Sequence, residues 1–263
     1  MRRSWLPLLA LVLAACTGAP SGLPPGSGDD HIADQSGTPR TAPAEPSSLA
    51  AIAPATPTPH ATFAIGDRVS SGQADFDCDG RADRLDFYMR VGASAQDAPF
   101  VARLTLATGA TSDLALEGTS DVAPLMGTAD VNGDRCDDAI VTVGRGASTT
   151  WTTFLVYDGT ELRRVEEDGK PVMFLFGGSV RHGNAIECRT TKDASEIIAR
   201  AASDYTSDYQ WDTVEDVHRW STKTHLVLWS TTRSVIAVPV RDAMPTDQEK
   251  YWGLSCGNVK FSG

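Results

Sequence analysis

Two short acidic stretches carry the residue types and spacing that could do chemistry. The first, residues 75–83, reads Asp-Phe-Asp-Cys-Asp-Gly-Arg-Ala-Asp, so carboxylates stand at positions 1, 3, 5 and 9. These charges repel one another, and Ca²⁺, which takes about 6–8 oxygen ligands, would offset the repulsion. Gly80 at position 6 permits a sharp turn that directs the next carbonyl inward. The predicted ligands are Asp75, Asp77, Asp79, the carbonyl of Arg81, and Asp83.

A second stretch, residues 130–138, begins 55 residues later and places oxygen ligands at the same positions. Its predicted ligands are Asp130, Asn132, Asp134, the carbonyl of Cys136, and Asp138. A third, degenerate copy begins near Cys188, keeps only Glu196 at position 9, and carries Lys192 at position 5. We therefore predict two Ca²⁺ sites and one metal-free copy.

An EF-hand is the main alternative, because the first stretch also has Asp86 at position 12. The residues that follow argue against it. Arg84–Val91 alternates polar and apolar side chains, which is the period of a strand and not of an exiting helix. The second stretch has Val141 at position 12, where an EF-hand requires a carboxylate. The acidic loops are therefore predicted to connect strands.

Residues 62–263 are predicted to form an all-β domain of antiparallel repeats that start near residues 75, 130 and 188. Each repeat has the order acidic loop, strand, glycine-rich turn, strand, hairpin, strand, which is the order of a four-stranded blade. Thr246–Glu249 has the form of a capping box and predicts one short helix. An aromatic residue recurs near the second strand of each repeat and is predicted to pack in its core: Phe100, Trp151 and Trp211.

The Asp spacing in residues 75–83 and 130–138 resembles that of the FG-GAP/VCBS repeat family. The resemblance covers roughly residues 62–205. It implies β-propeller blades with Ca²⁺ bound in loops between them. Because the chain offers about three repeats, the resemblance implies a partial or small β-propeller.

The first residues predict export. Arg2 and Arg3 precede a short apolar run that ends in Leu13-Ala-Ala-Cys16, which resembles a bacterial lipobox. We predict a signal peptide at residues 1–15, a lipid on Cys16, and a disordered tether rich in Pro, Ala, Ser and Thr at residues 16–61. The alternative is an ordinary signal peptide with an incidental cysteine. The whole chain resembles lipoproteins of high-GC Gram-positive bacteria (actinobacterial type). We expect an extracytoplasmic protein, lipid-anchored at the outer face of the cytoplasmic membrane.

The chain has five cysteines, and four of them remain if Cys16 carries a lipid. An even number in an exported chain predicts two disulfides with three possible connectivities. The four lie near repeat starts or in the closing segment, which favours Cys78–Cys136 and Cys188–Cys256. A zinc site is the alternative, although no Cys-x-x-Cys pair is present.

One serine and one histidine, Ser179 and His182, stand close enough in sequence to suggest nucleophilic catalysis. They lack a Gly-x-Ser-x-Gly elbow, so we predict a structural role. The net charge of −11 argues against a nucleic-acid partner. Two functions remain: a surface module that binds a glycan or a protein with Ca²⁺ as a staple, or a calcium-stabilised enzyme that acts on polysaccharides or catalyses another hydrolysis.

Overall fold

The computed structural model describes residues 63–93, 98–118 and 123–262, and their regular structure is β apart from one 3₁₀ turn. The predicted signal peptide, Cys16 and the tether to residue 61 lie outside these residues. None of the described residues forms a helix of the length and hydrophobicity needed to cross a bilayer. The all-β prediction is therefore confirmed for the described part of the chain.

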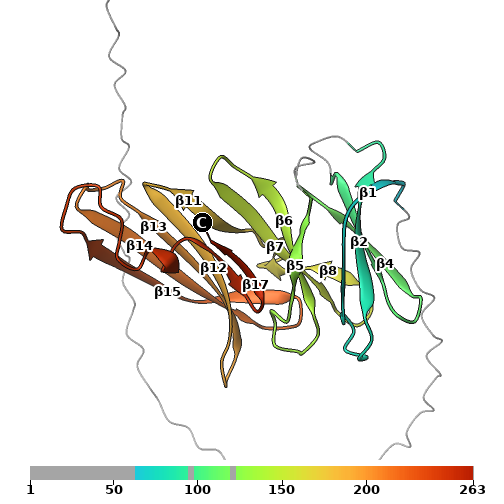
Figure 1. Ribbon diagram of the computed structural model, residues 1–263. Helices are drawn as coiled ribbons and strands as arrows, with labels where there is room; N and C mark the ends of the chain where they lie inside the picture. The colour runs from blue at the N-terminus through green and yellow to red at the C-terminus, as the bar shows by residue number, and fades with distance from the viewer. Residues whose placement is uncertain (1–62, 94–97, 119–122, 263) are drawn as a thin grey trace, which may run out of the picture. The chain divides into compact units, whose positions relative to one another are not determined.

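The first sheet is an antiparallel meander of four strands in chain order (Figure 1). Its strands are β1 (Ile65–Ala74), β2 (Asp83–Arg90), β3 (Phe100–Thr105) and β4 (Thr111–Leu116). The first acidic stretch forms the loop between β1 and β2. Gly72 lies against Leu125, since a Cβ at this position would meet the leucine side chain at 2.6 Å.

The second sheet has 13 strands. They are β5 (Leu125–Ala129), β6 (Asp138–Arg145), β7 (Thr149–Tyr157), β8 (Leu162–Arg164), β9 (Glu166–Glu167), β10 (Lys170–Pro171), β11 (Phe174–Ser179), β12 (His182–Thr190), β13 (Ser195–Ser203), β14 (Gln210–Trp220), β15 (His225–Ala237), β16 (Gly253–Cys256) and β17 (Val259–Ser262). It contains two further four-stranded meanders, β5–β8 and β12–β15. The second acidic stretch connects β5 to β6.

These meanders are not separate blades, and the described strands do not close into a propeller. Strand β7 pairs with β8 through Leu155–Tyr157 and with β11 through residues 149–152. Since β11 also pairs with β12, one continuous sheet includes the second and third meanders. Two pairings are parallel, β12 with β16 and β9 with β15, whereas the sequence predicted antiparallel pairing only.

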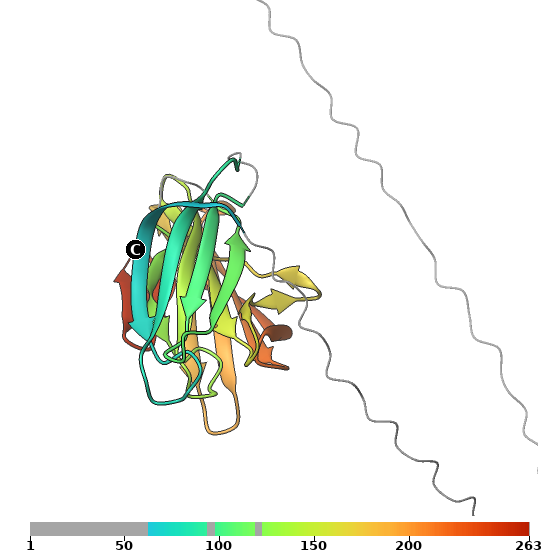
Figure 2. The same ribbon diagram turned by 90° about the vertical axis from the view of Figure 1, so that its right-hand side faces the viewer.

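Strands β6 and β7 are buried on both faces, and they form the middle of the core. Val141 and Leu155 point toward the first sheet, where they join Leu85 and Phe87 in one cluster. On the other face, side chains of β6 and β7 pack against β11, β12, β13 and β16. Figure 2 shows the first sheet in front of the larger one. The stretch at 139–143, apolar except for the buried Thr142, is typical of a strand covered on both faces.

The recurring aromatic residues do contribute to the core. Phe100 and Trp211 are each 1 % exposed, and Trp151 packs partly buried against the cluster that contains Leu85. Both favoured disulfides, Cys78–Cys136 and Cys188–Cys256, are also confirmed, with Cα–Cα distances of 4.9 and 4.6 Å. The second of them joins β12 to β16 at a paired register position.

The predicted helix at Thr246–Glu249 is reduced to a single 3₁₀ turn, Gln248–Lys250. Asp247 precedes this turn and makes no capping hydrogen bond with its side chain. The N-cap position therefore falls on Asp247 and not on Thr246, so the predicted capping box of Thr246 and Glu249 is out of register with the turn.

Asp158, in the β7–β8 turn, should make the stability of the fold depend on pH. Burial opposes the charge of Asp158, but hydrogen bonds from Thr160, Glu161 and Arg163 hold its pKa at about 2. A pKa below the unfolded value of 3.8 gives stability that is present above pH 4 and lost as pH falls toward 2. We expect Asp158→Asn to cost about 1–2 kcal/mol at pH 7 and nothing near pH 2. Urea denaturation across this range measures it, and a cost that stays constant would contradict the assignment.

Candidate metal centre

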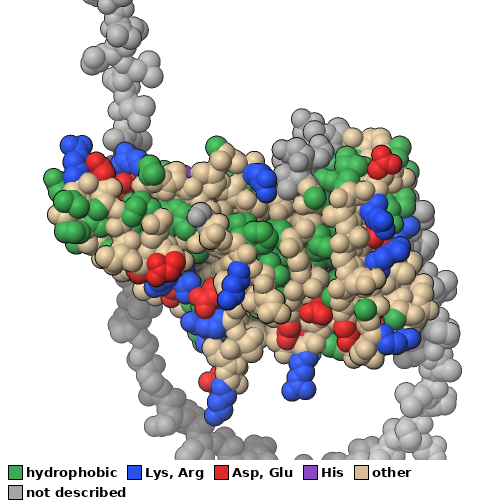
Figure 3. All heavy atoms as spheres, viewed as in Figure 1, with side chains coloured by type: hydrophobic (Ala, Val, Ile, Leu, Met, Phe, Trp, Pro, Cys, Tyr) green, Lys and Arg blue, Asp and Glu red, His purple; other side chains and the backbone are tan. Residues whose placement is uncertain are grey.

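The two acidic loops and the β12–β13 loop lie at the same end of the domain, which is the lower end in Figures 1 and 2. Each loop connects the first strand of a four-stranded meander to the second. Charged side chains of both signs follow this lower border in the space-filling view (Figure 3). The sheets therefore bring to one end of the domain the stretches that the sequence singled out.

In the first loop, the carboxylates of Asp75, Asp77 and Asp79 converge, with one oxygen of each within 4.8 Å of the others. Backbone N–H groups hold them in place. Asp75 accepts from the N–H groups of Asp79 and Gly80 at 3.1 and 2.9 Å, and Asp77 accepts from that of Asp79 at 3.1 Å. Three carboxylates held this close by the backbone form a plausible oxygen cage for a hard cation.

The remaining acid of this loop, Asp83, has a different environment. Asp83 is 1 % exposed and accepts from the N–H of Phe76 at 2.9 Å and from that of Ala107 at 2.7 Å. Both of its oxygens therefore have a donor. The Arg81 side chain folds back and pairs with Asp79, and its backbone N–H donates to the same carboxylate at 2.8 Å.

Electrostatics distinguishes the members of the first loop. The pKa of Asp77 is raised, first by desolvation and then by the charges of Asp83, Asp79 and Asp75. The pKa of Asp79 is lowered, chiefly by the hydrogen bond from the Arg81 side chain. The negative charge at Asp77 is therefore only partly compensated, and a bound cation would favour its ionised form.

The second loop has the same framework of hydrogen bonds. Asp130 accepts from the N–H groups of Gly133 and Arg135 at 2.6 and 3.0 Å. Asn132 Oδ1 accepts from the N–H of Asp134 at 2.9 Å, and Asp134 Oδ1 accepts from that of Cys136 at 3.0 Å. Backbone N–H groups of the loop thus hold the side chains at positions 1, 3 and 5, as they do in the first loop.

The two loops also share a backbone conformation, although their glycines stand at different positions. Positions 4 and 6 are left-handed in both: Cys78 and Gly80 have φ of 60° and 81°, and Gly133 and Arg135 have φ of 82° and 74°. Only glycine adopts this region without cost, so each loop contains one strained residue, worth about 1–2 kcal/mol. Gly80 therefore makes the predicted turn, and Arg135 makes it in the second loop.

Asp138 is the strongest sign of a cation site. Its Oδ2 accepts from the N–H of Val131 at 3.0 Å, and the N–H of Asn132 also lowers its pKa, but its Oδ1 makes no hydrogen bond of normal geometry among the described residues, although the residue is 1 % exposed. Desolvation, together with the charges of Asp134 and Asp130, raises its pKa well above the usual value. A buried carboxylate oxygen without a partner is costly. A cation coordinated by this oxygen would remove the cost.

The third copy shows how the same position is neutralised without a metal. Glu196 is 3 % exposed and accepts from Arg189 and Arg219, at 2.5 and 2.9 Å. Its pKa is lowered, first by the hydrogen bond from Arg189. In all three copies the acid at position 9 accepts from the residue at position 2, through the backbone N–H in the first two and through the guanidinium in the third.

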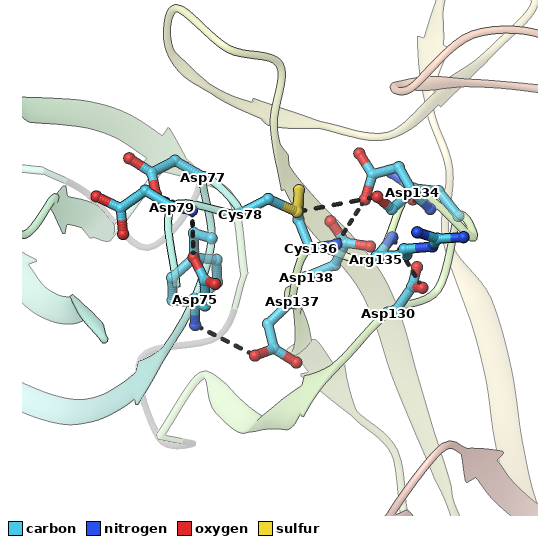
Figure 4. Close-up of a disulfide and its surroundings, with 12 residues drawn as sticks. Asp75, Asp77, Cys78, Asp79, Asp130, Asp134, Arg135, Cys136, Asp137 and Asp138 are labelled. Atoms are coloured by element: carbon cyan, nitrogen blue, oxygen red, sulfur yellow. Dashed lines mark hydrogen bonds between the residues drawn. A yellow bond between two sulfur atoms is a disulfide. The ribbon is translucent and has the colours of Figure 1, made fainter. Parts of the chain in front are cut away.

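The first and second loops are joined directly (Figure 4). The Cys78–Cys136 disulfide connects them, and Asp75 exchanges two hydrogen bonds with Asp137. The Asp137 N–H donates to the Asp75 carbonyl at 2.8 Å, and the Asp75 N–H donates to Asp137 Oδ2 at 3.2 Å. Both thiols are consumed by the disulfide, so the cluster of Cys78, Cys136 and Asp134 offers no thiolate to a metal.

Sequence reasoning missed two residues of this site. Asp137 lies within the second stretch but at a position without a ligand role, so nothing indicated its contact with Asp75. Lys223 comes from the β14–β15 turn, and its ammonium lies 2.9 Å from Asp134 Oδ2. Only the fold brings this lysine to a loop that precedes it by about 90 residues.

The pair Ser179 and His182 does meet, with Ser179 Oγ 2.9 Å from His182 Nδ1. The contact follows from the β11–β12 hairpin, in which these two residues are the last cross-strand pair. Tyr205 Oη lies 3.0 Å from the same nitrogen, whereas a catalytic triad places the serine and the acid on opposite nitrogens of the ring. The adjoining Gly178 and Gly183 make room for the Trp252 indole, since a Cβ on either would clash with it. These contacts agree with a structural role.

Several hollows lie elsewhere in the described residues, and one of them, of about 360 Å³, lies between residues 167–175 and the face of β12–β14. It contains two acids, and each has a partner. Glu167 Oε1 lies 2.8 Å from Nδ1 of the buried His218, and Asp216 accepts from the Thr231 hydroxyl at 2.6 Å. A hydrolase of the glycosidase type needs two acids available to the substrate, and these two are engaged.

Comparisons with known proteins add no relative. A scan against protein-family models, a search of curated proteins and a search of solved structures each returned no match to this chain.

Proposed function

We propose that this protein is an extracytoplasmic interaction module whose two acidic loops bind Ca²⁺ and which is held at the outer face of the cytoplasmic membrane by a lipid on Cys16. The observation that carries the metal assignment is the buried Oδ1 of Asp138, which has no hydrogen-bond partner among the described residues and belongs to a carboxylate whose pKa the charges of Asp134 and Asp130 help to raise. The converging carboxylates of the first loop support a second site. The anchor rests on Leu13–Cys16 and stays a prediction.

In this proposal the three meanders are blade-like modules, and Ca²⁺ fastens the loop between the first two strands of the first and of the second meander. The metal would be held by side chains at positions 1, 3, 5 and 9 in both loops, with the carbonyls of Arg81 and Cys136 as further ligands. Mg²⁺ demands a tighter octahedron and keeps its waters, so the looser cage favours Ca²⁺. The partial-propeller architecture implied by the FG-GAP/VCBS resemblance belongs to this proposal.

Exposed aromatic and aliphatic side chains on the third meander support a binding role over an enzymatic one. Tyr205, Tyr209, Leu228, Trp229 and Val235 are each more than half exposed. Arg219 lies over the Trp229 ring at 4.2 Å from its centroid. Exposed aromatic residues beside cations are typical of surfaces that bind glycans or proteins. A glycan or a protein is therefore the proposed ligand.

Terbium luminescence tests the metal assignment, because Tb³⁺ can replace Ca²⁺ and is sensitised by a nearby phenol. Tyr157 is close to the first loop, since its pKa is raised by desolvation and by the charges of Asp77, Asp158 and Asp83. We expect Tb³⁺ emission on excitation of the protein, competed away by Ca²⁺. Tyr157→Phe should remove more than half of the signal without changing the Ca²⁺ affinity.

Lys192→Ala, in the metal-free third copy, is the matched control and should leave the emission unchanged. Asp79→Ala, which removes a carboxylate of the first loop, should remove the Tyr157-dependent part. A chain that shows no emission at millimolar Tb³⁺ would sink the assignment of both loops.

A further inference from the structure

The tip of the β14–β15 hairpin reaches into the second acidic loop. Lys223 is about half exposed and lies in this tip, and its Nζ is 2.9 Å from Asp134 Oδ2. That oxygen is buried and lacks a hydrogen bond of normal geometry within the described residues, so the contact is an ion pair. The position-5 carboxylate of the loop is therefore neutralised by a residue from a distant hairpin.

A second contact joins the same two segments. Asn132 Nδ2 donates to the carbonyl of Lys223 at 3.4 Å. Two predicted metal ligands, Asn132 and Asp134, thus bind one residue of the hairpin tip, through its backbone and through its side chain. The first loop differs, because the cation on Asp79 is Arg81 of the loop itself.

A single lysine cannot complete this site. Asp130, Asp134 and Asp138 carry three formal charges, and the ammonium offsets one of them. Asp138 Oδ1 stays without a partner, at 1 % exposure of the residue. A divalent ion coordinated by the loop would supply the missing charge and a partner for that oxygen. Repulsion between this ion and the ammonium would then act against the Lys223–Asp134 pair.

We propose that Lys223 is a tethered counter-cation that Ca²⁺ displaces from the second loop. The inference rests on the proposed Ca²⁺ binding. It adds that Ca²⁺ binding to this loop breaks the Lys223–Asp134 ion pair and releases the tip of the β14–β15 hairpin. Lys223, a residue outside the acidic motif, therefore lowers the Ca²⁺ affinity of the second loop.

The test isolates the second loop by Asp79→Ala, which removes a carboxylate of the first loop in the full chain, and measures Ca²⁺ binding by calorimetry. Lys223→Met removes the competing charge and keeps the aliphatic stem. We expect it to tighten Ca²⁺ binding about tenfold, because one like charge leaves the site. Lys223→Arg keeps the charge and should stay within about twofold of the parent. An unchanged or weaker affinity in Lys223→Met would overturn the role of Lys223 while leaving Ca²⁺ binding intact.

Acylation of Lys223, followed by mass spectrometry, gives a readout that does not depend on affinity. Displacement predicts that Ca²⁺ raises the acylation rate of this amine at least twofold in the otherwise unaltered chain. The increase should vanish in Asp138→Asn, which cannot complete the site. A rate that Ca²⁺ leaves unchanged or lowers would contradict displacement. If no second-loop variant binds Ca²⁺, including Lys223→Met, the proposed Ca²⁺ site of the second loop itself fails.

Discussion

Replacing Cys188 and Cys256 with alanine is expected to lower the free energy of unfolding by about 4 kcal/mol. The bond closes a segment with a sequence separation of 68, and the chain-entropy model gives about this value for such a loop. Cys256 is fully buried, and its strand β16 joins the sheet through parallel pairing with β12. Alanine is preferred to serine as the replacement, because a serine at the buried Cys256 position would leave a hydroxyl without a hydrogen-bond partner.

Urea denaturation with a two-state fit measures this loss, and the matched comparison is Cys78→Ala with Cys136→Ala. That bond has a sequence separation of 58, so its entropic contribution is nearly the same. Loss of the Cys78–Cys136 bond should additionally weaken Ca²⁺ binding, because this bond joins the two acidic loops. A loss below about 1 kcal/mol for Cys188 and Cys256 would show that β16 holds its place without the bond.

Chelation is expected to have an effect of similar size. At about 10 mM Ca²⁺, about 100 times a dissociation constant near 0.1 mM, each occupied loop adds about 2.7 kcal/mol. EDTA should therefore remove about 5 kcal/mol from the free energy of unfolding measured in Ca²⁺. Asp79→Ala and Asp138→Asn should each abolish about half of this difference. Equal stability of the parent chain in Ca²⁺ and EDTA would contradict the proposal.

Asp138→Asn separates a metal ligand from a merely structural acid by the sign of its effect. In Ca²⁺ the variant loses one site and is less stable than the parent. In EDTA it should be more stable by about 1 kcal/mol, because a neutral amide replaces a buried carboxylate whose Oδ1 has no partner. Destabilisation of similar size in both conditions would indicate a structural role.

Local sequence patterns predicted much of the fold. The alternation after residue 83 corresponds to strand β2, because each face of a strand repeats every second residue. The mainly apolar stretch at 139–143 corresponds to β6, which is buried on both faces. The patterns did not predict how meanders join. The fusion through β7 depends on which half of a nine-residue strand each neighbour takes, and that choice is made by tertiary contacts.

The candidate site shows a similar division. Its ligand spacing is local, so the positions of Asp75–Asp83 and Asp130–Asp138 could be read directly. Sequence could not tell that Asp83 has donors on both oxygens while Asp138 Oδ1 has none, since the extra donor is the Ala107 N–H from another turn. Lys223 and Asp137 likewise enter through contacts between segments far apart in the chain.

The two disulfides have a consequence for proteolysis. Cys78–Cys136 and Cys188–Cys256 each close a covalent ring. One backbone cut inside either ring leaves the polypeptide in a single piece, whose fragments separate only after reduction. A cut between the rings, in residues 137–187, leaves two fragments that no covalent bond joins. If Cys16 carries a lipid, a surface protease acting within a ring would nick this protein without shedding it.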